Sequence, residues 1–138
     1  MKIIDGKNAV LGRLASYAAK EALKGEEISI LNCEQIIITG SKKDIKKNFE
    51  EKRKKIGSGQ QGPKHSRLAE KIVRRAIRGM IPNYRYGRGK IAYQKIKCYV
   101  GTPDAFKDKK KIVGTKEKKS KFILVKDLIK NNLNKKNE

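Results

Sequence analysis

KIIDGKNAVLGRLASYAAKEALKGEEISILNCEQIIIT, residues 2–39, is the stretch that decides the fold of this chain. It begins with a short extended segment at 2–5 and an Asp5-Gly6 turn. Apolar residues then recur at spacings of three and four, which predicts an amphipathic helix capped by Gly25. These residues are Leu11, Leu14, Ala15, Ala18, Ala19, Ala22 and Leu23. Two β-branched runs follow at 28–33 and 36–39, so strand, helix and strand predict a βαβ unit and a largely parallel sheet.

A basic helix and a loop are predicted next. Residues 41–56 place Ser41 and Asp44 in capping-box-like positions, and eight basic residues surround a narrow apolar stripe. The stripe consists of Ile45, Phe49 and Ile56. This pattern predicts a helix that is mostly solvated or faces RNA. Residues 57–63, GSGQQGP, have the composition of a loop.

The rest of the chain gives shorter signals. Apolar spacing predicts a helix over 68–78 that is stopped by Gly79 and Pro82. Alternation at 96–100 predicts a strand, and a last strand at 122–125 precedes a closing helix at 126–133. We expect one domain over 1–133, with a basic RNA-binding segment at 62–99, an irregular lysine-rich segment at 104–121 and a frayed tail at 134–138. Cys33 and Cys98 lie in apolar runs and are expected to be reduced, buried small hydrophobes.

Positive charge is concentrated in the later part of the chain. Residues 1–41 carry no net charge, whereas 42–61, 62–99 and 100–138 carry +5, +10 and +7, for a total of +22. This distribution predicts a folded platform with polyanion-facing surfaces, although net charge alone does not distinguish nucleic acid from an anionic membrane. No segment has the roughly 18 to 20 apolar residues of a membrane span, and the first residues lack a signal-peptide pattern. We expect a soluble, cytoplasmic protein with no membrane partner.

Arginine is concentrated between Arg67 and Arg88, where six of the eight arginines lie, although the chain has 28 lysines. Arginine pairs with phosphate through two parallel hydrogen bonds and stacks on bases. On a helix over 68–78, five cations share an arc of about 100°, opposite an apolar face. The cations are Arg67, Lys71, Arg74, Arg75 and Arg78; the apolar residues are Leu68, Ala69, Ile72, Val73, Ala76 and Ile77. We interpret this as a nucleic-acid-binding face, in preference to a solvated basic face without a ligand.

The segment 83–90, NYRYGRGK, mixes aromatic, basic and glycine residues. Tyrosine and arginine planes can stack on unpaired bases, and glycines allow a backbone to approach phosphates closely. The candidate side chains are Tyr84, Arg85, Tyr86, Arg88 and Lys90. Upstream, Lys64 and His65 lie in the same basic region. His65 could contact a phosphate or could simply shape the loop.

Catalytic and cofactor sites are not predicted. Residues 6–13, GKNAVLGR, loosely resemble a phosphate-binding loop, but five residues separate the glycines instead of four, and Arg13-Leu14 replaces the required lysine and hydroxyl. A single histidine and a basic region with one acid provide no nucleophile and base set. We therefore expect no enzyme activity, no metal, no cofactor and no small-molecule substrate.

Several motifs together resemble the universal protein-thirteen family of the large ribosomal subunit, in its archaeal and eukaryotic branch. They run in order from Ile3 to Pro103, and LGRLAS and RGMIP in combination are specific. The motifs are IDGKNAVLGRLASYAAKEALKG, LNCEQIIITG, GPKHSR, RRAIRGMIP, RGK and KIKCYVGTP. GPKHSR and the short linker before it indicate the branch. After Pro103 the lysine-dense sequence departs from the family pattern.

The resemblance implies a three-layer α/β/α domain with a four-stranded, mainly parallel sheet. It also implies a structural constituent of the large ribosomal subunit that binds ribosomal RNA, supports assembly and translation, and contacts neighbouring ribosomal proteins. The family's RNA-facing positions would fall on Arg67, Arg74, Arg75, Arg78, Arg85, Arg88 and Lys90. Two alternatives remain at this point: a general nucleic-acid-coating protein, and an enzyme on a nucleotide-binding α/β fold.

Overall fold

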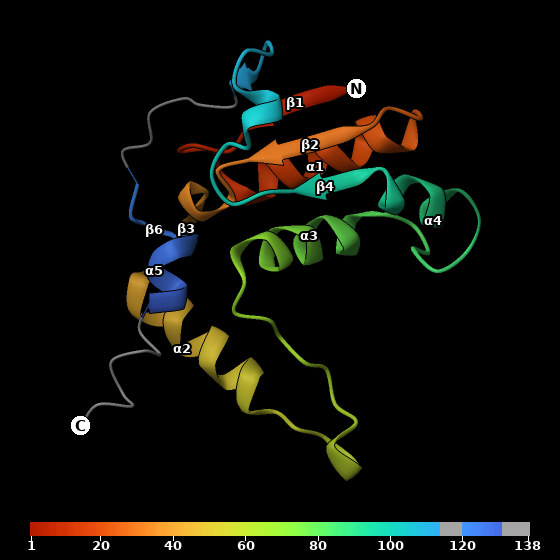
Figure 1. Ribbon diagram of the computed structural model, residues 1–138. Helices are drawn as coiled ribbons and strands as arrows, with labels where there is room; N and C mark the ends of the chain where they lie inside the picture. Colours follow the sequence, from red (N-terminus) through yellow and green to blue (C-terminus); the bar gives the residue numbers. More distant parts are fainter. Residues whose placement is uncertain (114–119, 131–138) are drawn as a thin grey trace.

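The predicted βαβ unit supplies the two central strands of the main sheet and one of the helices that cover it (Figure 1). In the computed structural model, which describes residues 1–113 and 120–130, β1 (Lys2–Asp5) leads to α1 (Leu11–Leu23) and then to β2 (Ile28–Leu31). β1 and β2 are parallel, with Ile4 opposite Ile30. Gly25 caps α1 as predicted, because its φ is +100° and its N–H donates to the carbonyl oxygen of Ala22 over 3.0 Å.

Two short strands complete a parallel sheet in the order β4-β2-β1-β5. β4 (Ile96–Cys98) pairs with β2, and β5 (Ile112–Val113) pairs with β1. The predicted fold class, α/β with a four-stranded, mainly parallel sheet in one domain, is confirmed. The prediction that 104–121 is irregular was wrong in two places, since this segment contains η3 (Asp104–Phe106) and β5. Its residues 114–119 lie outside the described part of the chain.

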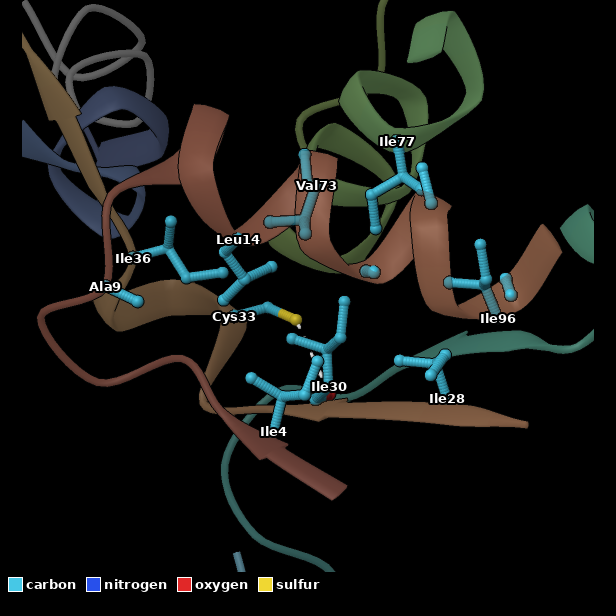
Figure 2. Packing of buried hydrophobic residues seen from close by; sticks show 14 of the residues in the cluster. Ile4, Ala9, Leu14, Ile28, Ile30, Cys33, Ile36, Val73, Ile77 and Ile96 are labelled. Atoms are coloured by element: carbon cyan, nitrogen blue, oxygen red, sulfur yellow. Dashed lines mark hydrogen bonds between the residues drawn. The ribbon is translucent and has the colours of Figure 1, made fainter. Parts of the chain in front are cut away.

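The main core lies between the sheet and two helices, as Figure 2 shows. Ile4, Ile28, Ile30 and Ile96 point from the sheet toward α1 and α3 (Ala69–Met80). Small residues of α1 allow that helix to approach closely, and all of them are buried: Ala15, Ala18, Ala19 and Ala22. Val73 and Ile77 of α3 close the cluster with no exposed surface. Burial of this apolar surface is the main force that holds the domain together.

The opposite face of the sheet is covered as well. Ile3, Ser29 and Leu31 alternate with the core residues of β1 and β2, and all three are buried. Beyond β4, Tyr99 packs against Phe106 of η3 with ring centroids 5.5 Å apart. The layer on this face therefore includes a short 3₁₀ turn.

A separate two-stranded sheet lies beside the first. β3 (Ile37–Thr39) follows η1 (Cys33–Gln35) and pairs antiparallel with β6 (Phe122–Leu124). Asn32 redirects the chain at this point with a left-handed backbone, φ +53°. The predicted closing helix begins at Val125 as α5 (Val125–Lys130). Its predicted end at 131–133 and the predicted tail at 134–138 lie outside the described residues.

Helix α2 (Lys42–Lys54) extends away from the sheet and buries no residue completely (Figure 1). Ile45 and Phe49 are half-buried, as expected for the predicted stripe, but Ile56 lies beyond the helix and is 61% exposed. The predicted capping box is wrong, because the N-cap residue Ser41 makes no side-chain hydrogen bond to the helix. The chain then passes through η2 (Ser58–Gln60) in the predicted loop and returns to α3.

Both cysteines are free thiols, as predicted. Cys33 is buried and donates a weak hydrogen bond from Sγ to the carbonyl oxygen of Ile30 over 3.7 Å. A hydrogen bond with the Cys98 thiol and burial raise the pKa of Cys33, so the thiol stays protonated. Cys98 is only half-buried, contrary to expectation, because it lies on the edge strand β4.

Candidate nucleic-acid interface

Helix α3 carries the predicted division into an apolar and a cationic face. Ala69, Val73 and Ile77 are buried, whereas Ile72 and Ala76 are half-buried. Leu68 was wrongly assigned to the apolar face: it is the N-cap residue, has an extended backbone and is 50% exposed. The helix also continues two residues past the predicted end, through Gly79 to Met80. The apolar spacing therefore predicted the helix and its buried side, and the error is confined to the two ends.

The cations of this helix have no carboxylate partner among the residues that the structure describes. The ion pairs found there lie elsewhere and join Met1 to Glu26, Lys2 and Lys24 to Glu21, and Lys107 to Asp104. Arg67, which was predicted to share the helix face, precedes the N-cap residue and lies outside α3, where it is exposed. Within the helix, Lys71 is exposed and Arg74, Arg75 and Arg78 are half-buried. A cluster of like charges without internal compensation attracts an external anion.

The Tyr/Arg/Gly-rich segment 83–90 is folded into a turn and the start of a helix. A turn over 81–86 leads directly into α4 (Gly87–Gln94), which packs against α1 and ends at β4. Gly89 is buried in the first turn of α4, and a Cβ atom there would lie 1.8 Å from the carbonyl oxygen of Pro82. This glycine therefore permits close packing of the chain on itself, not the predicted approach to phosphate. The sequence did not predict the helix α4, because this helix has only eight residues and begins with Gly-Arg-Gly.

Arginines of α3 stack on tyrosines that follow it in the chain. The guanidinium carbon of Arg74 lies 4.5 Å from the ring centroid of Tyr93, and that of Arg78 lies 4.7 Å from Tyr84. The two tyrosine rings are in edge contact, with centroids 5.9 Å apart. Such cation–π contacts fix the planes of both guanidinium groups before any ligand binds.

Arg85 is a second arginine in contact with Tyr84. Its guanidinium carbon is 5.5 Å from the ring centroid, and its Nε donates to the phenol oxygen over 3.2 Å. This hydrogen bond lowers the pKa of Tyr84, because it stabilises the phenolate form. Tyr84 is thus engaged with two arginines, whereas Tyr86 is 72% exposed. Of the two tyrosines predicted to stack on bases, Tyr86 presents the more accessible ring.

A groove of about 490 Å³ lies between α2, the segment 64–66 and α3. No acidic residue lines it, whereas six cations do. The cations are Lys52, Lys64, Lys71, Arg74, Arg75 and Arg78. His65 and Ser66 also line it, and apolar surface comes from Leu11, Phe49, Ile72 and Tyr93. We call this feature the basic groove.

The pKa of His65 is lowered in the basic groove. Burial lowers the pKa of its imidazole, and the nearby cations Arg75, Lys52, Arg53 and Arg78 lower it further. The ring is consequently neutral at pH 7. Arg75 shapes the same region, because its Nη1 donates to the backbone oxygen of Lys64 over 3.3 Å.

The structure divides the twelve predicted RNA-binding residues into two groups. Six line the basic groove: Lys64, His65, Lys71, Arg74, Arg75 and Arg78. The other six lie outside its lining, at Arg67, Tyr84, Arg85, Tyr86, Arg88 and Lys90. The sequence-based list missed Phe49, Lys52 and Tyr93, which reach the groove from α2 and α4. The charge run of α2 was visible in the sequence, but nothing in it indicated which side faces α3.

Within the described residues, no helix is long and apolar enough to cross a bilayer. The same part of the chain holds no group of three or more His, Cys, Asp or Glu side chains suited to a metal ion.

Fold and surface together define a class: a small, strongly basic α/β protein whose exposed cations are arranged on a helix and around a groove. Comparison with known proteins identifies the family. A family model described as Ribosomal protein L13 matches residues 1–105. The chain belongs to the ribosomal protein L13 family, in its archaeal branch.

Similar proteins from three archaea carry the name large ribosomal subunit protein uL13. The protein of Methanococcus maripaludis is 48% identical over 107 residues, which cover 75% of this chain and 77% of that protein. The protein of Methanocaldococcus jannaschii is 45% identical over 106 residues, which cover 75% of this chain and 77% of that protein. The protein of Methanopyrus kandleri is 46% identical over 101 residues, 73% of this chain; the match spans 62% of that relative's length.

Proposed function

We propose that this protein is a structural constituent of the large ribosomal subunit that binds and stabilises folded ribosomal RNA. It would act in the cytoplasm, within the ribosome, and support subunit assembly and translation. The observation that carries the proposal is the uncompensated cationic surface of α3 and the basic groove, in a chain whose relatives are named large-subunit proteins. Neighbouring large-subunit proteins are the expected protein partners.

The chemistry of the surface favours phosphate over other anions. Arginine offers paired N–H groups to phosphate oxygens, and Arg74 and Arg78 are already oriented by their tyrosine contacts. Arg85, Arg88 and Lys90 extend the same charge past the groove. Such contacts hold a fold of RNA in place and do not read a sequence. If about six phosphates are neutralised, affinity falls on the order of a thousandfold between about 50 and 200 mM salt.

A general nucleic-acid-coating protein is the competing function. Such a protein would bind duplex DNA and ribosomal RNA fragments equally well, because it would recognise charge alone. The stacked arginines and the basic groove, which combines cations with apolar side chains, instead favour a particular RNA shape. The nucleotide-binding enzyme considered from the sequence has no support in the family, which consists of structural ribosomal proteins.

Sedimentation of cell extract through a sucrose gradient after a salt wash tests the proposal. We expect the protein to travel with large subunits and to stay with them under washing conditions that remove loosely bound proteins. A protein that remains at the top of the gradient before any wash would contradict the proposed function. Equal binding to duplex DNA and to large-subunit RNA fragments would support the competing one.

A further inference from the structure

The basic groove has two walls, and the predicted RNA-binding residues lie on the side of α3 and the segment before it, whereas for α2 the sequence left a solvated and an RNA-facing helix open. α3 supplies Lys71, Arg74, Arg75 and Arg78, while α2 supplies Phe49 and Lys52 from the opposite side. Figure 1 shows that the chain leaves α2, passes through the loop and returns to α3, so the two helices are joined at one end. A groove with this form can take an extended ligand that enters between the helices.

Two buried donors in this region have no partner in the described part of the chain. They are Nε of Arg74 and Nη1 of Arg53. A buried N–H group without an acceptor costs about 1–3 kcal/mol, and more when the group is charged. Arg74 lines the groove, and Arg53 lies one residue from the lining residue Lys52. An anionic oxygen bound in the groove would give the Arg74 donor the acceptor that it lacks.

The lining indicates the chemical class of the ligand. Six lining cations without a lining carboxylate favour an anionic ligand. A free inorganic ion would make no favourable contact with the apolar surfaces of the lining, which belong to Leu11, Phe49, Ile72 and Tyr93. A sugar–phosphate backbone combines an anionic group with apolar ribose faces. A single strand of RNA fits this combination better than free phosphate does.

We propose that the basic groove holds a phosphodiester strand of RNA between α2 and α3, and that His65 takes up a proton from solvent when the strand binds. This inference rests on the proposed function and adds to it a second RNA-binding element, α2, together with a proton-linked contact. Among the described residues, the charged groups that act on His65 are all cations: Lys52 and Arg53 on α2, and Arg75 and Arg78 on α3.

The proton uptake follows from the same arrangement. In the free protein, burial and four neighbouring cations disfavour imidazolium. A bound phosphate cancels part of that positive potential and offers an acceptor, so it favours the protonated ring. Binding should therefore strengthen as pH falls from 8 to 6. By linkage, the gain in affinity is up to about tenfold for each unit by which binding raises the pKa of His65.

The test uses the fact that His65 is the only histidine in the chain. NMR titration of its imidazole in the full chain would be carried out alone, with a short single-stranded RNA from the large-subunit RNA, and with inorganic phosphate. We expect RNA to move the titration midpoint upward, and inorganic phosphate to move it less. In parallel, RNA affinity should depend on pH in the wild type and lose that dependence in His65→Gln.

Two matched variants of α2 locate the effect. Lys52→Gln removes a lining cation, and Lys47→Gln removes an exposed cation of the same helix outside the lining. We expect Lys52→Gln to lower RNA affinity several-fold and to reduce the salt slope by about one, while Lys47→Gln has less effect on both and leaves the His65 shift intact.

The outcomes separate this inference from the proposed function. If RNA binds with a steep salt dependence but the His65 midpoint stays fixed and the two variants behave alike, the groove inference is overturned and the proposed function stands. A shift with inorganic phosphate but not with RNA would also overturn it. If no RNA binds at any pH, the proposed function itself fails.

Discussion

Gly89 is the residue on which the path of the chain after α3 depends most directly. A Cβ atom at this position would lie 1.8 Å from the carbonyl oxygen of Pro82 and 2.7 Å from that of Asn83. Neither backbone oxygen can move without opening the turn between α3 and α4. We expect Gly89→Ala to lower the free energy of unfolding by about 3 kcal/mol or more, as measured by urea denaturation.

Gly79 provides the control for that substitution. It lies within α3, and a Cβ atom there would meet nothing within 4 Å. Gly79→Ala should raise the free energy of unfolding by about 0.5–1 kcal/mol, because alanine is the better helix former. Equal effects of the two alanines would contradict the packing role given to Gly89.

Glu21 is a buried carboxylate whose charge is held by two lysines. Lys2 donates to its Oε2, and Lys24 donates to its Oε1 over 2.8 Å. These hydrogen bonds, from Lys2 first and then Lys24, lower the pKa of Glu21 to about 2. Because the folded state binds this proton less readily than the unfolded state, the contribution to stability is complete above pH 4.5 and disappears as pH falls toward 2.

Glu21→Gln tests that contribution while it preserves side-chain volume. We expect the variant to be less stable than the wild type at pH 7, with a difference that narrows as pH falls from 4.5 toward 2. Chemical denaturation of both proteins at several pH values measures this difference in the free energy of unfolding. Glu27→Gln, at an exposed position of the same region, should leave the pH profile unchanged; a constant deficit for Glu21→Gln at every pH would argue against the charge interaction.

At the scale of elements, α3 combines two tasks on two faces. Ile77 belongs to the core and is fully buried, whereas Arg75 faces the basic groove. Ile77→Ala should lower the free energy of unfolding by about 2–5 kcal/mol, because it leaves a cavity. Arg75→Ala should change stability by less than about 1 kcal/mol but lower RNA affinity and reduce its salt slope by about one.

Thermal denaturation and RNA titration of both variants measure this separation. We expect Ile77→Ala to bind RNA normally at a temperature where the variant remains native. If Arg75→Ala unfolds as easily as Ile77→Ala, the cationic face would be part of the core, and its assignment as a ligand-binding surface would fail.

Elements differed in how well the sequence predicted them. Long periodic segments such as α1 and α3 were recognisable because their buried residues repeat at helical spacing over three turns. α4 and β5 were missed because eight residues beginning with Gly-Arg-Gly, and two β-branched residues among lysines, carry almost no periodicity. Their positions are determined by tertiary contacts, with Pro82 and Asn83 for α4 and with β1 for β5.

The candidate site was predictable only as a set of residue types. The arginine face of α3 followed from helical projection, but the partners of those arginines did not. Tyr93 stacks on Arg74 although it follows that residue by 19 positions, and Lys52 lines the same groove although it precedes Arg74 by 22 positions. Contacts between residues so far apart require the three-dimensional path of the chain, and in particular the return of the chain from α2 to α3.

At the scale of the whole molecule, charge and structure are divided along the chain. The neutral first 41 residues supply α1, the two central strands β1 and β2 of the four-stranded sheet, and β3 of the two-stranded sheet. They also supply more than half of the buried residues of the main core. The basic remainder supplies the helices and turns that surround the groove. A stable neutral platform therefore allows the cationic surface to be dense, because the repulsion among its charges is offset by burial elsewhere.

The central claim is that the cations of α3 attach this protein to the large subunit. Its most direct test is the incorporation of a triple variant, Arg74→Ala, Arg75→Ala and Arg78→Ala, into large subunits, measured by sedimentation and quantified against the wild type. The matched control replaces Lys7, Arg13 and Lys20, three exposed cations of the neutral segment, by alanine. We expect the folded triple variant, verified by circular dichroism, to be absent from large subunits while the control is incorporated. Normal incorporation of the triple variant would contradict the central claim.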